Sequence, residues 1–172
     1  MNKFSTAKIC RAGIIAGLYF VLTYFLQAIS FGPVQLRVSE AFTILPLFFP
    51  EAVPALFIGC FLSNTISGFG PYDMILGSLA TLLASILTAY IGKLIKNKTL
   101  KFILGAIPPI VINAIVIPFV IYLSGGLEYT YFIQALLLFA GQALAIYTLG
   151  GLLYYSIYSL KENNPSSAIF KK

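Results

Sequence analysis

The sequence predicts an all-α integral membrane protein, a compact bundle of about six transmembrane helices. Hydrophobic residues make up 59% of the chain and charged residues only 9%, with a mean hydropathy of +0.94, well outside the range of soluble globular domains. The apolar residues fall into six segments separated by glycine, proline and charged residues. A chain of 172 residues has room for about six crossings of roughly 20 residues each, so we expect residues 1–172 to form a single transmembrane domain.

The first apolar segment is expected to be a permanent helix. Lys3, Lys8 and Arg11 precede it, as in a signal peptide. Its apolar run is too long for one, however, and lacks a small-residue cleavage site before Ser30. The remaining segments follow without a linker or repeat. The six segments are residues 9–30, 38–49, 52–67, 72–94, 100–124 and 131–158.

The second and third segments are short. At 1.5 Å per residue they measure about 20 Å and about 24 Å, less than a hydrocarbon core of roughly 30 Å. Two true crossings and a re-entrant hairpin from outside both fit the pattern of charges. Either way, short helices leave a cavity or a thinned region, where membrane proteins tend to place substrate sites. Glu51, between the two segments, stands near a helix N-terminus and needs no functional role there.

Small residues one helical turn apart predict close helix packing in the fourth and first segments. The fourth has two such rows, so we expect it to lie centrally and to pack on two sides. In the first, Ala12 stands above Ala16 and Gly13 above Gly17. Packing within the bundle explains these pairs, and docking of another protein's helices is the alternative. The rows of the fourth segment are Gly77, Thr81 and Ser85, and Ala80, Ala84 and Thr88.

Positive charges sort by loop as the positive-inside rule expects. They precede the first helix, lie between the fourth and fifth, and follow the sixth, so that both termini are predicted to be cytoplasmic. Arg37 is then the only basic residue outside, and Glu40, Asp73 and Glu128 fall near the same outer face. The net charge of +6 therefore reflects topology, not nucleic-acid binding. The inner charges are Lys3, Lys8, Arg11, Glu51, Lys93, Lys96, Lys98, Lys101, Lys161, Glu162, Lys171 and Lys172.

The sequence offers few groups for a catalytic or metal site. The chain has no histidine, and Cys10 and Cys60 suit lone buried thiols better than a disulfide or a metal site. The Gly92–Lys93 pair is followed by leucine and lacks a phosphate-loop context, so we expect no ATP hydrolysis by this chain. With no paired carboxylates on one helix and no activated serine motif, we expect neither an enzyme nor a bound cofactor or metal.

Two stretches of the chain resemble a known family. Residues 34–64, "VQLRVSEAFTILPLFFPEAVPALFIGCFLSN", and residues 70–85, "GPYDMILGSLATLLAS", resemble the QueT family. Its members are substrate-binding S components of energy-coupling factor (ECF) transporters associated with queuosine precursors. The resemblance covers most of the chain and is densest over residues 34–92. It implies a six-helix bundle in a bacterial plasma membrane, with a ligand pocket that faces outward. The whole bundle is then expected to topple in the membrane and release the ligand inside.

The resemblance also implies partners. Ala12 and Ala16 match the AxxxA motif by which the first helix of S components docks on a shared transmembrane coupling subunit. That subunit and two cytosolic ATPase subunits supply the energy, so ATP is used by the partners and not by this chain. A self-sufficient small-solute carrier or channel is the alternative, and an intramembrane enzyme is a third reading. Copurification with the partners, or transport by the isolated chain, separates the first two.

Charged residues near the outer face are the first candidates for a substrate site. Arg37 and Glu40, at i and i+3, can pair with each other at the membrane surface or contact a ligand. Glu40 can accept two hydrogen bonds from a planar N–H pair, such as the pyrimidine edge of a deazaguanine. Asp73, which follows Pro71, can stabilise a helix N-terminus or face a ligand amine.

Further candidates are polar or aromatic. Amides within apolar helices bridge helices or line a cavity, and tyrosines stack on a heterocycle or form an interfacial belt. Glu128 and Tyr129 are either solvated or part of a lid. Because carboxylates outnumber basic residues outside, the expected ligand is rich in donors or positively charged, as aminomethyl-deazaguanine is. These further candidates are Asn64, Tyr72, Asn113, Tyr122, Glu128, Tyr131, Gln134 and Gln142.

Overall fold

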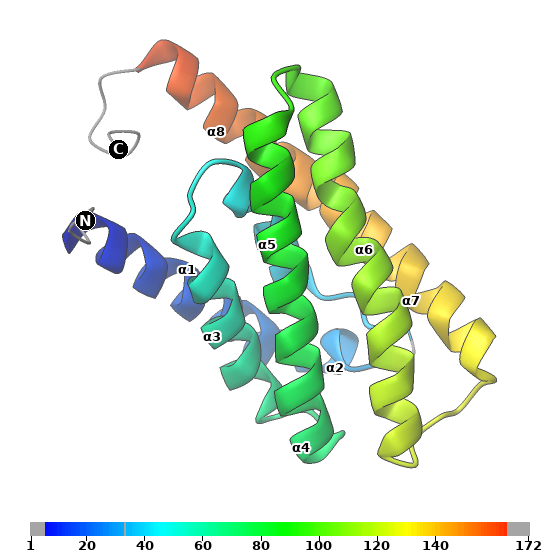
Figure 1. Cartoon of the computed structure of the whole chain (residues 1–172). Coiled ribbons are helices and arrows are strands. Elements are labelled where there is room, and N and C mark those ends of the chain that lie inside the picture. The colour runs from blue at the N-terminus through cyan, green and yellow to red at the C-terminus, as the bar shows by residue number, and fades with distance from the viewer. Residues whose placement is uncertain (1–5, 33, 165–172) are drawn as a thin grey trace.

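The structure, a computed structural model, describes residues 6–32 and 34–164 (Figure 1). Lys3, Lys171 and Lys172, whose charges enter the predicted topology, lie outside these residues. Every regular element in the described part is helical, which confirms the predicted fold class. In chain order the elements are α1 (Thr6–Phe25), α2 (Gln27–Ser30), η1 (Val38–Leu47), α3 (Ala52–Asn64), α4 (Gly70–Tyr72), η2 (Asp73–Gly77), α5 (Ser78–Leu94), α6 (Lys98–Leu123), α7 (Tyr131–Ala145), η3 (Ile146–Gly150) and α8 (Gly151–Asn163).

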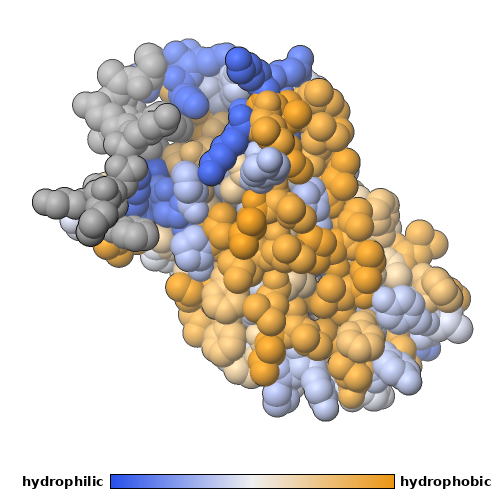
Figure 2. Space-filling view, in the orientation of Figure 1, coloured by the Kyte–Doolittle hydropathy of each residue, from blue (hydrophilic) through white to orange (hydrophobic). Residues whose placement is uncertain are grey.

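Four helical stretches of the described chain are long and apolar enough to cross a membrane. They are Thr6–Phe25, Gly70–Leu94, Lys98–Leu123 and Tyr131–Asn163. Two shorter apolar helices, η1 and α3, lie between the first and the second of these, as the short second and third segments predicted. Figure 2 shows apolar side chains covering α5 and α6, with hydrophilic residues gathered towards one end. This is the surface expected of helices that face lipid.

Helix η1 differs from the α-helix expected for the second segment, because it is a 3₁₀ helix of ten residues. Such helices rise about 2 Å per residue and seldom run so long. Pro46 has no N–H for an α-helical bond in the last turn, and burial of most of the helix supports the tighter winding. The Thr43 hydroxyl donates to the Glu40 carbonyl over 2.6 Å. At this rise ten residues measure about 20 Å. Helix η1 therefore has the length expected for an α-helix over residues 38–49, although it is shorter in sequence.

Helices α1 and α3 pack with their backbones in close contact. A Cβ added at Gly59 of α3 would lie 2.9 Å from Tyr19 Cβ and 3.0 Å from the carbonyl oxygen of Ala16, so only glycine fits there. Leu56 and Cys60 of α3 are buried in the same core cluster as Ala16 and Tyr19. Close packing of this kind is the main source of helix association in lipid.

Helix α5 lies at the centre of the bundle, against α3, α6 and η1 (Figure 1). Both predicted rows of small residues are buried, which confirms packing on two sides. Towards α6, the Thr88 hydroxyl donates over 2.9 Å to the carbonyl oxygen of Gly105. Pro109 has no N–H to donate to that oxygen, so Thr88 supplies the hydrogen bond that the helix itself cannot make.

Charged residues mark one end of the bundle. Arg11 of α1 forms an ion pair with Glu51, the residue before α3, and lies over the ring of Phe49. The Lys98 ammonium at the start of α6 lies 4.1 Å above the ring of Tyr158 in α8. Figure 1 shows the end of α8 and the α5–α6 turn at the top and the start of α1 at the left, whereas α4 and the α6–α7 turn lie at the bottom. Glu51 thus has a structural role beside Arg11.

Candidate functional site

A buried carboxylate, Glu40, lies where three helices meet. It is near the start of η1 and only 1% exposed. The hydroxyl of Tyr19, in α1, donates to Oε1 over 2.5 Å, and the amide of Asn113, in α6, donates to Oε2 over 3.4 Å. Helices far apart in sequence therefore converge on one acceptor group, which an isolated helix would not bury because of its desolvation cost.

Arg37 precedes η1 and is also buried. Its Nη1 donates to Asn64 Oδ1 over 3.2 Å and its Nε to the carbonyl of Ser30 over 3.3 Å. Its ion-pair partner in the described structure is Asp73, with Nη2 3.6 Å from Oδ2, and not Glu40 as the i, i+3 spacing suggested. The physical reason is that Arg37 has an extended backbone and is not yet part of the helix, so the helical spacing does not apply to it.

Asp73 and Asn64 complete the group. Asp73 begins η2, a π-helical turn of the kind that often occurs at functional sites. The Asn64 amide donates to the Asp73 backbone carbonyl over 2.9 Å. Gly77 leaves room for both side chains, because a Cβ there would lie 2.5 Å from Asp73 Oδ1 and 2.9 Å from Asn64 Nδ2. Asp73 thus faces the interior and pairs with Arg37 rather than merely stabilising the end of a helix.

The electrostatics of this group favour a donor or a cation. Arg37 contributes one positive charge, and Glu40 and Asp73 contribute two negative ones when ionised, which leaves a formal charge of −1. Burial alone would lower the pKa of Arg37, but the negative groups around it, Asp73 first, raise that pKa above its ordinary value. The guanidinium therefore stays charged.

Several buried polar atoms near these residues have no hydrogen-bond partner in the described part of the chain. Buried polar groups are nearly always paired, so a cluster of unpaired ones indicates a place that binds a polar ligand or water. They include donors as well as acceptors. The atoms in this region are Ser30 Oγ, Gln35 Nε2, Arg37 Nη2, both carboxylate oxygens of Asp73, Ser78 Oγ and Asn113 Oδ1.

The loop between α2 and η1, which contributes Arg37, has an unusual backbone conformation. Gln35 is buried and has a φ of 46°, a left-handed conformation that is unusual for a residue with a long side chain. The loop also packs closely against α7, since a Cβ at Gly141 would lie 2.5 Å from the Val34 carbonyl oxygen. Such strained, buried backbone persists only where the surrounding structure imposes it, and it is common at ligand-binding sites.

Sequence reasoning missed part of this group. Tyr19 and Thr23 lie on the same face of α1 as Ala12 and Ala16, at helical spacing. This spacing could have predicted that both side chains face the interior of the bundle. The conformation of Gln35 has no signal in the sequence beyond a nearby glycine.

Other predicted residues lie elsewhere. Tyr72 and Tyr122 are exposed, and so are Glu128 and Tyr129 in the α6–α7 turn, while Tyr131 donates to the Ile115 carbonyl. None of these is brought to Glu40 by a contact in the described structure. Gln134 and Gln142 are buried in α7, and Gln142 follows Gly141, which lies close to the backbone of Val34. The group that the structure assembles is therefore Arg37, Glu40, Asn64, Asp73 and Asn113, with Tyr19.

The two alanines of α1 differ in exposure. Ala16 is buried against Gly59 of α3, and Ala12 is half-buried beside the same core cluster. Gly13 and Gly17 lie on the open side, where an added Cβ would meet nothing within 4 Å. Ala16 therefore packs within the bundle, whereas Gly13 and Gly17 are exposed.

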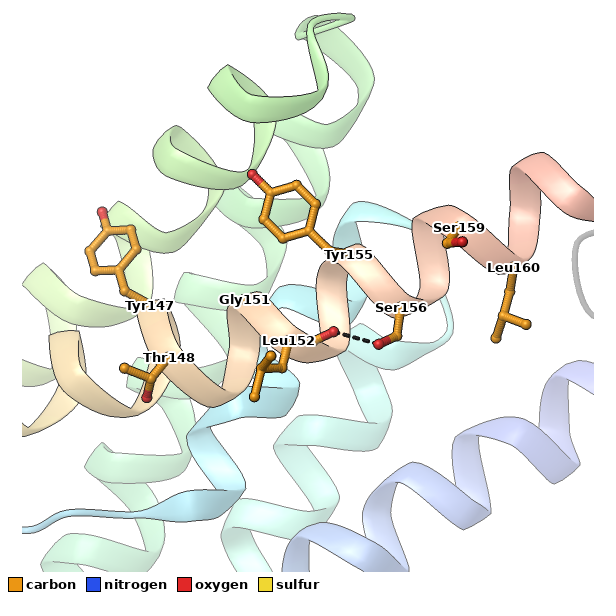
Figure 3. A pocket seen from close by; sticks show the side chains of 8 residues that line it. All are labelled: Tyr147, Thr148, Gly151, Leu152, Tyr155, Ser156, Ser159 and Leu160. Atoms are coloured by element: carbon orange, nitrogen blue, oxygen red, sulfur yellow. Dashed lines mark hydrogen bonds between the residues drawn. The ribbon is translucent and has the colours of Figure 1, made fainter.

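A hollow lies along η3 and α8, away from the Glu40 group, as Figure 3 shows. The hydroxyls of Thr148 and Ser156 donate to the backbone carbonyls of Leu144 and Leu152, one turn earlier, so they are already engaged. Leu152 and Leu160 project with mainly apolar surface. The hollow lacks the charged and unpaired groups that surround Glu40. Its lining residues are Tyr147, Thr148, Gly151, Leu152, Tyr155, Ser156, Ser159 and Leu160.

Comparison with known proteins gives one family. The sequence model of the QueT transporter family matches residues 9–159. "Queuosine precursor transporter QueT" of Lactococcus lactis subsp. cremoris (strain MG1363) is 43% identical over 84 residues, which are 48% of this chain and 49% of that protein. The chain thus spans about half the length of the curated relative it matches. No solved structure matches the chain.

Proposed function

The chain belongs to the QueT transporter family, and on that premise we propose that it is the substrate-binding membrane subunit, or S component, of an ECF-type importer. Its ligand is a queuosine precursor of the 7-deazaguanine class, captured outside and delivered to the cytoplasm. The role is transport and not catalysis. The chain crosses the plasma membrane of a bacterium several times, with both termini cytoplasmic. The sorting of lysine and arginine to one end of the bundle supports this orientation.

The proposed ligand class rests on the buried carboxylate of Glu40. A 7-deazaguanine presents a ring N–H and an exocyclic amine side by side, and a carboxylate accepts such a pair with its two oxygens. Tyr19 and Asn113 each occupy one oxygen of Glu40, but each oxygen has a second lone pair free to accept. A buried carboxylate is costly unless it is paired, so a ligand with two donors is favoured there over one with acceptors.

Asp73 suits a positively charged substituent on the same ligand. Both of its carboxylate oxygens lack a hydrogen bond in the described structure, although Arg37 lies 3.6 Å away. The formal charge of −1 over Arg37, Glu40 and Asp73 is neutralised by one ammonium group. Aminomethyl-deazaguanine has such a group, whereas the nitrile precursor does not.

Partner subunits supply the energy in this proposal. The chain has no phosphate-binding loop, so a transmembrane coupling subunit and two cytosolic ATPases would drive release. The first helix is the proposed docking element, as the Ala12 and Ala16 motif led us to expect. Because Ala16 packs against α3, a partner helix would meet Ala12 together with the open row of Gly13 and Gly17.

Titration calorimetry of the purified chain with aminomethyl-deazaguanine tests the ligand assignment. A charge-assisted hydrogen bond is worth about 1.5 to 3 kcal/mol, so Glu40→Gln should weaken binding roughly 10- to 150-fold. Glu162→Gln, an exposed carboxylate at the end of α8, is the matched control and should bind like wild type. Wild-type affinity in Glu40→Gln would remove Glu40 from the site.

Import by the isolated chain in liposomes would contradict the need for partners.

A further inference from the structure

We propose that Tyr19 is a positioning residue for the ligand: its phenol holds the Glu40 carboxylate in the orientation that accepts the ligand's N–H pair. The inference rests on the proposed function and names the part of the fold that prepares Glu40. Tyr19 belongs to α1, a helix that otherwise contributes packing surface to the bundle. Its role would thus be to set the direction of the Glu40 acceptor atoms, without itself contacting the ligand.

Two hydrogen bonds join α1 to the first turn of η1. The Tyr19 hydroxyl donates to Glu40 Oε1 over 2.5 Å, and the hydroxyls of Thr23 and Ser39 lie 2.7 Å apart. Tyr19 and Thr23 are one helical turn apart and Ser39 adjoins Glu40, so the two contacts are neighbours on both helices. All four side chains are buried. The contact between Thr23 and Ser39 fixes the backbone of η1 beside α1, and the contact between Tyr19 and Glu40 fixes the carboxylate.

The Tyr19 contact is the stronger of the two anchors on Glu40. An O–H donor to a carboxylate forms a short, charge-assisted bond, and 2.5 Å is at the short end of that range. The other anchor, the Asn113 amide, is 3.4 Å from Oε2, near the limit of a hydrogen bond. Without Tyr19, the long Glu40 side chain would have to be ordered by the ligand itself, which lowers affinity.

Tyr19 is itself held rigidly, as a positioning residue must be. The side chain is fully buried, and the missing side chain at Gly59 is what allows α3 to approach its Cβ. The backbone of α1 at Tyr19 is thus fixed against α3, and full burial leaves the ring little room to turn away from Glu40. Rigid support of this kind is what keeps a binding group in productive geometry.

The test compares two ligands on the purified full chain by titration calorimetry. The probes are 7-aminomethyl-7-deazaguanine and its analogue without the 2-amino group, which offers Glu40 only one N–H. Tyr19→Phe should bind the first probe about 10-fold more weakly, since a charge-assisted bond that orders Glu40 is lost. The loss for the analogue should be smaller, so discrimination between the two probes falls. Tyr24→Phe, a partly exposed tyrosine of the same helix, should leave both affinities unchanged.

The outcomes separate this inference from the proposed function. If wild type binds neither probe, the proposed ligand class is wrong. If wild type binds and Tyr19→Phe matches it, or loses affinity for both probes by the same factor, Tyr19 does not orient Glu40. Should Tyr19→Phe fail to fold, Thr23→Val is the second variant. It frees the start of η1 from α1, so Glu40 moves relative to the Tyr19 phenol and the loss should again be larger for the first probe, with exposed Thr65→Val as the control. Equal affinities in Thr23→Val and wild type would then overturn the inference.

Discussion

The guanidinium of Arg37 lies 3.6 Å from the carboxylate of Asp73, with both side chains buried. Removing one partner of a buried pair leaves an uncompensated charge, which costs about 3 to 5 kcal/mol. We therefore expect Arg37→Met to lower the free energy of unfolding by about that amount. The double variant Arg37→Met with Asp73→Leu should recover much of the loss. Denaturant titration in detergent measures both, and equal stabilities of Arg37→Met and wild type would show that the pair is not formed.

Gly77→Ala should damage the site directly. The new Cβ would lie 2.5 Å from Asp73 Oδ1 and 2.9 Å from Asn64 Nδ2, so these side chains must move. Overpacking of this kind costs about 1 to 3 kcal/mol of stability, and we expect weaker binding of aminomethyl-deazaguanine as well. Gly17→Ala is the control, since a Cβ there meets nothing within 4 Å. Calorimetry and thermal unfolding should separate the two variants, and indistinguishable curves would count against the assigned geometry.

Thr88→Val should destabilise the bundle without touching the ligand site. The Gly105 carbonyl would lose the donor that replaces the missing N–H of Pro109. A buried acceptor left without a partner costs about 1 to 3 kcal/mol. Thr88→Ser retains the hydroxyl and should stay close to wild type in denaturant titration. If Thr88→Val and Thr88→Ser were equally stable, water would have to reach that carbonyl.

Cysteine labelling in intact cells should report the orientation of the chain. Asn97→Cys lies in the α5–α6 turn and Glu128→Cys in the α6–α7 turn, at opposite ends of the bundle. In a Cys10→Ser background, a membrane-impermeant maleimide should label Glu128→Cys and spare Asn97→Cys until the cells are opened. Cys60 is fully buried and remains in place. Strong external labelling of Asn97→Cys would reverse the predicted topology.

Apolar periodicity was enough to predict the membrane bundle. Segment lengths and the central position of α5 follow from hydrophobic runs and from small residues at four-residue spacing, which depend on local sequence. The winding of η1 was not predictable in the same way. Its backbone is fixed by burial against α1, α5 and α6, and a single proline, Pro46, is a weak sign of a 3₁₀ helix.

Pairing between distant residues was the part of the site that could not be read from the sequence. The identity of Arg37, Glu40 and Asp73 as candidates followed from their rarity in an apolar chain. Their partners did not, because Arg37 reaches Asp73 and Asn64 only after three segments have packed together. Spacing within one segment therefore suggested the wrong ion pair.

The contact between Asn113 and Glu40 has a consequence for biosynthesis. The two residues are 73 positions apart, so Glu40 leaves the ribosome long before the amide that contacts it. Until α6 is inserted, Glu40 can bond to Tyr19 but lacks its second donor, and lipid disfavours a carboxylate that is only partly paired. We expect residues 38–64 to stay near the membrane surface during synthesis and to settle only when α6 arrives. Glycosylation mapping of ribosome-bound chains truncated before and after α6 would show the shift, and identical maps would exclude late settling.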